Sequence, residues 1–579
     1  MARRIADPAL IDLRKRIRHS AAHVLAESVL KLFPQAKPTI GPPTDDGFYY
    51  DFDVDRPFTP EDIEKIAELM RVSIKADHRF EESEIERSEA RKRVQDNPYK
   101  LEIIEGIPEG EKITFARHGD FVDLCRGGHV RSTGEIAAFK LLSTAGAYWR
   151  GDERNRMLQR IYGTAWESGE ELEKFLLQVA EAEKRDHRRL GTELQLYFFD
   201  PSAPASPFFL PKGATVYNGL IDYMRQLYRK YGYQEVITPQ ILNVDLWKRS
   251  GHYDNYRENM FVVEIDERQF GVKPMNCPAH ALMYASTLRS YRDLPIRFAD
   301  FGRLHRYERS GVTHGLTRVR SFSQDDAHIF CAPDQIGSEI SGFISLLREA
   351  YQAFRFEELR VALSLRPEKR VGGEEIWDRA EVALEKVLED SGLSFDKMPG
   401  EGAFYGPKID FFVPDAIGRE WQLGTVQLDF SLSERFDLEF VAEDGSRQRP
   451  VVIHRAALGS LERFIGVLVE HTAGALPLWL APVQAVVIPI TDRNVSYADE
   501  VRAKLAEAGL RAEVDRSNER MNAKIRAAQL QKVPYMLVIG DREQAAGNVA
   551  VRRRAGGDLG ARPVDKVVRM LSDEVANRS

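Results

Sequence analysis

The feature that most restricts the fold of this chain is a series of strand-like runs that follow one another without a helix between them. RFADFGRLHRYER and THGLTRVRSFSQDDAHIF are rich in β-branched and aromatic residues, as expected for two strands joined by a loop. AFYGPKIDFFV and REWQLGTVQLDF form a second such pair. Consecutive strands favour an antiparallel sheet, so we expect residues 191–480 to form an antiparallel domain with flanking helices.

The rest of the chain is organised differently, and its 579 residues are too many for one core. The segment 481–579 alternates strands and helices, which predicts a small α/β domain. Residues 1–165 predict an α+β domain, and the charged segment 166–190 a helical connector. Within the first domain the hydrophobic spacing predicts helices over 13–33, 59–79 and 81–95.

Composition excludes several classes of protein. The chain is 43% hydrophobic and 30% charged, without an apolar run long enough to span a membrane and without a secretory signal at its N-terminus. Three scattered cysteines cannot build a disulfide framework, so we expect a reducing cytoplasm. The net charge of −7 excludes a protein that coats nucleic acid in bulk, and because the basic clusters are local, any nucleic-acid partner should be structured and bound selectively.

Four potential metal ligands stand out in the first domain. His19 and His23 lie one helical turn apart, opposite the apolar face of the predicted helix, and DLCRGGHV places Cys125 four residues before His129. Buried histidines and a stray core cysteine are the alternative. GxxxxGK[ST], HExxH and CxxC are absent, and GEGAFYG lacks the spacing of a dinucleotide fingerprint.

Three further segments carry residues suited to nucleotide chemistry. YGYQEVITPQI contains Pro239, FGRLHRYERSG contains Arg306 and Glu308, and ALGSLERFIGVLVE contains Gly459 and Arg463. Singly, they are typical of a surface ion pair or a helix cap. Together and in this order they resemble motifs 1, 2 and 3 of the class II aminoacyl-tRNA synthetases.

The resemblance implies an ATP site, and the physical chemistry agrees. An arginine fork binds phosphate oxygens and stacks on aromatic rings, and two approaching anions need such a positive clamp. The resemblance implies that Arg306 bridges a carboxylate and the α-phosphate, and that Arg463 contacts adenine and phosphates. It also implies that Glu308 lies on the adenine side, that Arg318 contacts the γ-phosphate, that Mg²⁺ accompanies ATP, and that motif 1 forms a homodimer.

KPMNCPAH, SFSQDDAHIF and VIHRAALGS further resemble the threonyl-tRNA synthetase family. This resemblance implies one zinc ion held by Cys277, His328 and His454, with a vacant position for substrate. From the residues alone, His305 and His314 compete as ligands. The resemblance also implies threonine contacts from Met275, Gln324, Asp326, Tyr405 and Gln422, and a role of His252 in transfer to the ribose.

The same family resemblance accounts for the first ligand set. A site built around a hydroxyl rejects valine, but serine lacks only a methyl group, which limits discrimination to about 10–200-fold. A second, hydrolytic site is the remedy. The resemblance therefore implies an editing domain in which seryl-tRNA is hydrolysed by a pocket of His19, His23, Lys100, Asp123, Cys125 and His129. The family resemblance favours a pocket without a resident metal, and a second zinc ion held by the two His and Cys pairs is the alternative.

The C-terminal unit resembles the anticodon-binding domain of several class II synthetases, which implies that Glu543 and Arg552 read the anticodon of tRNA(Thr). Many family members carry a further small N-terminal domain, and we expect this chain to lack it. The resulting expectation is an enzyme that joins threonine to tRNA(Thr) with ATP. The alternatives are another class II synthetase, or a synthetase-like protein that binds tRNA without catalysis.

Overall fold

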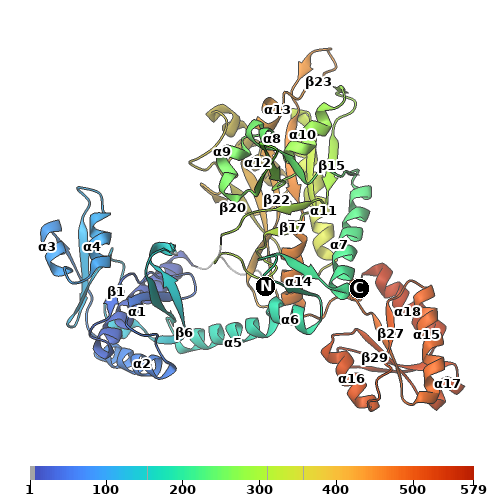
Figure 1. Cartoon of the computed structure of the whole chain (residues 1–579), viewed down its shortest axis with the longest axis horizontal. Helices are drawn as coiled ribbons and strands as arrows, with labels where there is room; N and C mark the ends of the chain where they lie inside the picture. Colours follow the sequence, from blue (N-terminus) through green and yellow to red (C-terminus); the bar gives the residue numbers. More distant parts are fainter. Residues whose placement is uncertain (1–6, 153, 310, 357, 579) are drawn as a thin grey trace. The chain divides into compact units, whose positions relative to one another are not determined.

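The computed structural model describes residues 7–152, 154–309, 311–356 and 358–578. The chain divides into two compact units, Met1–Ala180 and Glu181–Ser579. Figure 1 follows the chain by colour through both units. Within the described residues, no helix has both the length and the apolar character needed to cross a bilayer.

The first unit is built around one long helix and a four-stranded antiparallel sheet. Helix α1 (Pro8–Leu32) is buried over its whole circumference from Ser20 to Val29, because strands cover one side and α2 covers another. The polar side of α1 is therefore enclosed as well, and His23 is buried. The sheet order is β1-β2-β7-β6, and the elements are β1 (Lys37–Pro38), β2 (Phe48–Asp53), α2 (Pro60–Lys75), β6 (Ala138–Tyr148) and β7 (Met157–Trp166).

A second lobe of this unit corrects one prediction. A single helix over 81–95 is wrong, since 81–85 form a strand that pairs with Ile113–His118. Pairing places Ile85 opposite Ile113 in a small core, and this tertiary contact overrides the helical preference of the glutamates. The lobe contains β3 (Glu81–Ile85), α3 (Arg87–Arg93), α4 (Pro98–Glu105), β4 (Ile113–His118) and β5 (Phe121–Leu124).

The charged segment after Trp166 is helical, as its composition predicts. It forms α5 (Gly169–Arg185) and α6 (His187–Glu193), and the division between the two units falls inside α5. The side chain of Asp186 separates the two helices by accepting a hydrogen bond from the backbone of Arg188, as an N-cap does. Helix α6 therefore begins at His187 as a separate helix.

An eight-stranded sheet forms the centre of the second unit and confirms the predicted antiparallel fold. Its order is β10-β15-β18-β25-β22-β21-β19-β20, and only the two outermost pairs are parallel. The strands are β10 (Gln234–Glu235), β15 (Ile296–Asp300), β18 (Asp326–Cys331), β19 (Arg360–Ser364), β20 (Phe395–Met398), β21 (Lys408–Pro414), β22 (Glu420–Asp429) and β25 (Val451–Ala456).

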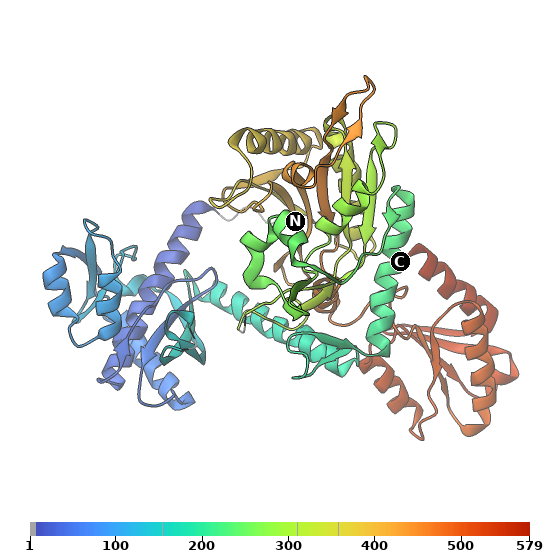
Figure 2. The same ribbon diagram turned by 45° about the horizontal axis from the view of Figure 1, so that its top comes forward.

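Helices cover both faces of this sheet, as Figure 2 shows from a second direction. One face packs in the main core with α7 (Pro211–Lys230), α11 (Ile336–Gln352), α12 (Glu374–Asp390) and α14 (Leu461–Thr472). The other face packs against α10 (Cys277–Ala285) and α13 (Ser431–Arg435). Smaller elements surround it, namely β8 (Tyr197–Phe199), β9 (Pro207–Phe209), β11 (Ile241–Asn243), α8 (Val244–Arg249), α9 (His252–Tyr256), β12 (Val262–Ile265), β13 (Arg268–Val272), β14 (Arg289–Ser290), β16 (Arg303–His305), β17 (Ser321–Ser323), β23 (Phe440–Val441) and β24 (Arg447–Gln448).

The C-terminal part of the second unit is the predicted α/β fold. Its sheet order is β27-β26-β28-β29-β30, and α15 and α18 share a core on one face while α16 packs on the other. The elements are β26 (Ala485–Pro489), α15 (Val495–Glu507), β27 (Ala512–Val514), α16 (Met521–Leu530), β28 (Tyr535–Ile539), α17 (Asp541–Ala545), β29 (Asn548–Arg553), β30 (Asp558–Pro563) and α18 (Val564–Asn577).

A buried carboxylate fixes the junction between β18, β25 and α14. Asp325 is fully buried and accepts hydrogen bonds of 2.8, 2.9 and 3.0 Å from the backbone N–H groups of residues 457, 458 and 459. The guanidinium of Arg455 donates to the carbonyl oxygen of Asp325 and stacks on Tyr228 and Tyr233. A charge-assisted network thus holds the turn that leads from β25 into α14.

We expect Asp325→Ala to destabilise the second unit by about 3–5 kcal/mol, because it leaves three backbone N–H groups without their acceptor and the buried Arg455 guanidinium without the carboxylate 3.5 Å away. Calorimetric unfolding measures the change. Asp390→Ala, at the exposed end of α12, serves as the control and should change stability by less than about 0.5 kcal/mol. Equal effects of the two substitutions would contradict this account.

Candidate functional site

The three predicted metal ligands of the second unit lie together. Cys277 begins α10, while His328 on β18 is directly opposite His454 on β25 in the antiparallel register. One ligand atom from each lies within 4.8 Å of the others, and all three residues are buried. Side chains directly opposite on one face of a sheet are the closest cross-strand pairs, which is why two distant histidines meet here.

The outer nitrogens of both imidazoles already have partners. His454 Nε2 lies 3.0 Å from Asp429 Oδ2, and His328 Nδ1 lies 2.8 Å from His280 Nδ1. The inner nitrogens, His454 Nδ1 and His328 Nε2, face each other at 2.8 Å. Such outer partners orient metal-binding histidines.

The donor set suits a tetrahedral metal. Two nitrogens at about 2.0 Å from a tetrahedral zinc are about 3.3 Å apart, so a shift of about 0.5 Å would accommodate the ion. One thiolate and two imidazoles leave a fourth position for a substrate group. His280 and Asp429 were not predicted as site residues, since neither stands in a spacing that indicates a ligand.

Several of the predicted threonine contacts border this cluster. The Tyr405 ring is 4.8 Å from that of His454, and its hydroxyl group is hydrogen-bonded to Gln427. A small cavity is lined by Tyr405, Cys277, His454 and His252, among others. His252 is buried, its Nε2 is 3.2 Å from Met275 Sδ, and it shares this cavity with Cys277 and His454.

The remaining predicted contacts are engaged with neighbours. Asp326 precedes His328 by two positions on β18 and accepts a 2.9 Å hydrogen bond from Asn276. Gln324 pairs with the backbone of Ser460 at the end of the same segment. The amide of Gln422 instead donates to Asp410, at 2.7 Å.

Of the four predicted ATP-binding residues, Arg306, Glu308 and Arg318 lie outside the regular strands and helices, and Arg463 lies in the first turn of α14. Arg306 donates to the carbonyl oxygen of Pro274, next to Met275, and stacks on Phe322. Arg463 in α14 donates to the carbonyl oxygens of Gln422 and Thr317.

Arg318 and Glu308 form an ion pair of 2.9 Å. Burial and the positive charge of Arg318 lower the pKa of Arg463, so these two guanidinium groups are electrostatic neighbours. Their mutual repulsion is relieved by an anion between them, as a polyphosphate would provide.

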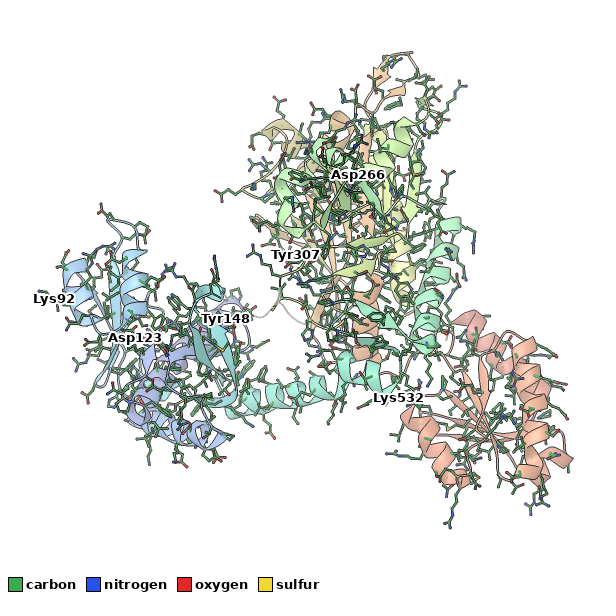
Figure 3. The ribbon with its side chains drawn as sticks, viewed as in Figure 1. Lys92, Asp123, Tyr148, Asp266, Tyr307 and Lys532 are labelled. Atoms are coloured by element: carbon green, nitrogen blue, oxygen red, sulfur yellow. The ribbon has the colours of Figure 1, made fainter. Side chains whose placement is uncertain are left out.

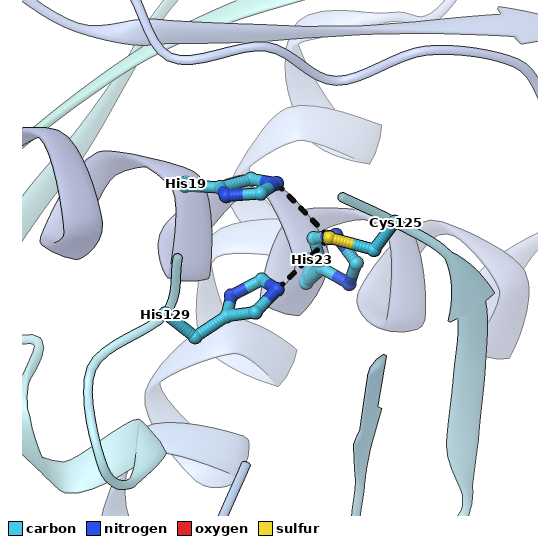
Figure 4. Close-up of side chains that lie close together, drawn as sticks. All are labelled: His19, His23, Cys125 and His129. Carbon is cyan, nitrogen blue, oxygen red and sulfur yellow. Dashed lines mark hydrogen bonds between the residues drawn. The ribbon is translucent and has the colours of Figure 1, made fainter. Parts of the chain in front are cut away.

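In the first unit, the four potential ligands that the sequence indicates lie together, and they are called the quartet below: His19, His23, Cys125 and His129 (Figure 4). Cys125 Sγ is 3.4 Å from His19 Nε2 and 3.1 Å from His129 Nε2, and one ligand atom from each of the four residues lies within 4.8 Å of the others. Ser20 on α1 is 3.2 Å from His129 Nδ1 and so orients that ring. Among the described contacts the buried Nδ1 of His23 has no hydrogen-bond partner, which marks a position for water or substrate.

A buried ion pair borders the quartet. Lys100 Nζ is 2.8 Å from Asp123 Oδ1, and the Tyr50 hydroxyl group lies between them, bonded to both (Figure 3 labels Asp123). Tyr50 was not predicted, because only its place on β2 beside Asp123 brings it here.

Burial sets the protonation of the quartet. It lowers the pKa of His19, lowers that of His23 strongly, lowers that of His129 to about 3, and raises that of the Cys125 thiol to about 12. At neutral pH the pocket therefore holds uncharged imidazoles and an uncharged thiol. Such neutral imidazoles can hold a water molecule by hydrogen bonds, and the uncharged thiol is a weak nucleophile.

The two predicted anticodon residues lie in the C-terminal α/β domain. Glu543 on α17 accepts a 3.0 Å hydrogen bond from the backbone N–H of Gly540, the N-cap residue of the same helix. Arg552 on β29 is 3.4 Å from Asp558 and is partly exposed. Helix α17 follows the end of β28 at Ile539, whereas Arg552 is opposite Met536 near the start of that strand, so the two residues lie toward different ends of β28.

Comparison with known proteins agrees with this geometry. Residues 261–472 match the family described as tRNA synthetase class II core domain (G, H, P, S and T), and residues 484–574 match the anticodon binding domain. Residues 113–162 match the threonyl and alanyl tRNA synthetase second additional domain. The fold and site are those of a class II aminoacyl-tRNA synthetase.

Curated relatives specify the family further. The threonine–tRNA ligase of Acetivibrio thermocellus is 52% identical over 98% of this chain and 89% of its own length, and that of Clostridium tetani is 53% identical with the same coverage. A crystal structure described as the RNA binding domain of threonyl-tRNA synthetase from Cryptosporidium parvum aligns with a TM-score of 0.65 and 47% identity, over 67% of this chain and 98% of that one. The chain belongs to the threonine–tRNA ligase family, which confirms the resemblance.

The protonation of the quartet can be measured directly. With a pKa near 12, Cys125 should react with iodoacetamide at pH 8 about a thousandfold more slowly than a free thiol. Mass spectrometry of the alkylated peptide measures this rate, and denatured protein, in which the thiol is exposed, is the control. Rapid alkylation in the folded protein at pH 8 would show that Cys125 is a thiolate, as in a metal site.

Proposed function

We propose that this chain activates threonine with ATP, transfers it to the 3′ end of tRNA(Thr), and hydrolyses mischarged seryl-tRNA(Thr). The observation that supports this most is that one chain holds both clusters: the buried Cys277, His328 and His454 beside the ATP-site arginines, and the neutral quartet in another unit. The first cluster would select amino acids that carry a side-chain hydroxyl group, and the second would hydrolyse the seryl-tRNA(Thr) that forms because serine also carries one.

In the synthetic site, the protein groups bind and orient the reactants. We propose that Arg306 and Arg463 neutralise the carboxylate and the phosphates, with Glu308 and Arg318 separating to meet adenine and the γ-phosphate. Met275, Gln324, Asp326, Tyr405 and Gln422 would enclose the amino acid, and His252, neutral because burial lowers its pKa to about 4, can accept a proton during transfer.

A zinc ion in the Cys277, His328 and His454 cluster would supply a Lewis acid that recognises the amino and hydroxyl groups of threonine together. Asp429 and His280 would hold the two histidines in the orientation that the ion needs. Mg²⁺ would accompany ATP.

In the editing pocket, we propose that His19, His23 and His129 position the hydrolytic water through their neutral rings, since burial keeps them uncharged. Cys125 would shape the pocket as a neutral thiol. The ion pair of Lys100 and Asp123 would place the ester of the tRNA 3′ end, and Tyr50 would fix that pair.

The surface and the cysteines support the assembly and compartment that we propose. Apolar side chains near motif 1 are exposed to an unusual degree, with Ile237 90% and Ile241 52% accessible, beside Val263 and Ile265. Contiguous exposed apolar side chains mark interaction surfaces, so we place a homodimer contact here. Three free cysteines are compatible with a reducing compartment, and we place the protein in the cytoplasm. Glu543 and Arg552 would read anticodon bases.

Threonine-dependent exchange of pyrophosphate into ATP tests the synthetic site. Among the twenty amino acids, threonine should support the strongest exchange, with about one zinc per chain by elemental analysis. Cys277→Ser should lose both zinc and exchange, whereas Cys331→Ser, which alters an equally buried cysteine outside the cluster, should keep both. Full exchange by zinc-free protein would refute the role of the metal.

Mischarging of tRNA(Thr) tests the editing pocket. His19→Ala should charge tRNA(Thr) with threonine normally but accumulate seryl-tRNA(Thr). The synthetic site is expected to prefer threonine over serine by only about 10–200-fold, so some serine is attached to the tRNA. The control is His78→Ala, an exposed histidine of the same unit, which should accumulate no serine product. If His19→Ala behaves like this control, the first unit has another role.

A further inference from the structure

Two residues of α14 hold the turn formed by residues 314–318, which follows motif 2 and is called the motif 2 turn below. Arg463 and Glu470 are seven positions apart and therefore lie on the same face of the helix. Arg463 Nη1 donates to the carbonyl oxygen of Thr317, at 3.1 Å. Glu470 is linked to Leu316, the residue before Thr317, by His187, whose ring is hydrogen-bonded to both.

His187 fills the space between Glu470 and the turn. Its Nδ1 is 2.5 Å from Glu470 Oε1, and the backbone N–H of Leu316 donates to its Nε2 at 2.9 Å. Its own backbone N–H also donates to Glu470 Oε1, and the ring is fully buried. Helices α6 and α14 lie side by side at this point (Figure 1).

The two contacts define the state of the ring. Because Leu316 N–H can only donate, Nε2 must accept, and Nδ1 must carry the proton that it donates to Glu470. Asp186, His187 and Glu470 are close enough together for a metal ion, but the free lone pair of the imidazole is occupied by Leu316. The ring is therefore a fixed spacer with one donor and one acceptor.

The packing around the ring leaves no room for adjustment. A Cβ atom on Gly315 would lie 2.2 Å from His187 Nε2, so only glycine permits the approach of the turn, and its φ is +46°. On the other side, a Cβ on Gly466 of α14 would lie 3.2 Å from Leu316. At the end of α5, Arg185 donates to the carbonyl oxygen of His471, which ties the incoming chain to α14 as well.

The position of the turn determines the position of the ATP-site arginines. Arg318 follows Thr317 directly and pairs with Glu308, while Arg463 is held by Thr317 itself. A displaced Leu316 would move the carbonyl oxygen that orients Arg463 and the backbone that carries Arg318. Displacements of about 1 Å in such groups reduce rates by up to about a hundredfold.

We propose that His187 is a positioning residue for ATP: it sets the distance between α14 and the motif 2 turn, and thereby the placement of Arg318 and Arg463. This inference rests on the proposed function of the synthetic site. It predicts that changes at His187 weaken the use of ATP while leaving the threonine pocket intact. The Cys277, His328 and His454 cluster lies on α10, β18 and β25, whereas the His187 ring is hydrogen-bonded to Glu470 of α14 and to Leu316.

The test is pyrophosphate exchange by His187→Ala, measured as a function of ATP and of threonine separately. We expect KM for ATP to rise about tenfold or more, with KM for threonine and zinc content unchanged. Leu384→Ala, which removes a buried side chain of α12 in the same core, is the control for lost stability and should leave both KM values unchanged.

Glu470 provides a second, milder test if His187→Ala does not fold. Glu470→Gln keeps an oxygen that accepts the Nδ1 proton and should retain a nearly normal KM for ATP, whereas Glu470→Ala should raise it as His187→Ala does. The double variant His187→Ala with Glu470→Ala should have a KM for ATP no higher than that of either single variant, because both substitutions break the same connection from Glu470 through His187 to Leu316.

Two results would overturn the proposal. One is an unchanged KM for ATP in His187→Ala and Glu470→Ala, and the other is an equal rise of KM for threonine, which would indicate general damage. Both presuppose that the wild-type chain performs threonine-dependent exchange. A wild-type chain without exchange would instead refute the proposed function, and this inference with it.

Discussion

The pairing of β18 with β25 is the constraint on which the synthetic site depends. It places His328 opposite His454, and the buried Asp325 locks the end of this pair by accepting three backbone hydrogen bonds from the turn into α14. Since α14 carries Arg463, one carboxylate connects the strand that holds a candidate metal ligand with the helix that holds a candidate phosphate ligand. Both halves of the site are thereby built on one rigid junction.

The two Cys and His clusters show how surroundings give the same side chains different chemistry. In the second unit, Asp429 and His280 occupy the outer nitrogens, so the inner ones converge on a common point. In the first unit, burial keeps all four groups neutral, and a buried nitrogen of His23 is without a partner among the described residues. We propose that the first arrangement binds an ion, and that the second binds a water molecule and an ester.

The sequence predicts the fold and the members of the two clusters better than it predicts the residues that orient the site residues. Strand runs without intervening helices and the alternation at 324–328 carry local signals, and the antiparallel sheet follows from them. Tyr50, Asp429 and His187 act through partners more than 20 positions away, so no local spacing reveals them. The strand at 81–85 is missed for the same reason, because its pairing with β4 is decided by tertiary contact.

The antiparallel register also limits how a chain of this kind can vary in length. Side chains alternate between the two faces of a strand, so inserting or deleting one residue within β25 would turn His454 toward the α7 and α11 side and replace it with a neighbour that cannot bind metal. The β12–β13 hairpin, with its exposed turn at Asp266 and Glu267, carries no such restriction. Length variation among related chains should therefore gather in hairpins of this type and avoid the central strands.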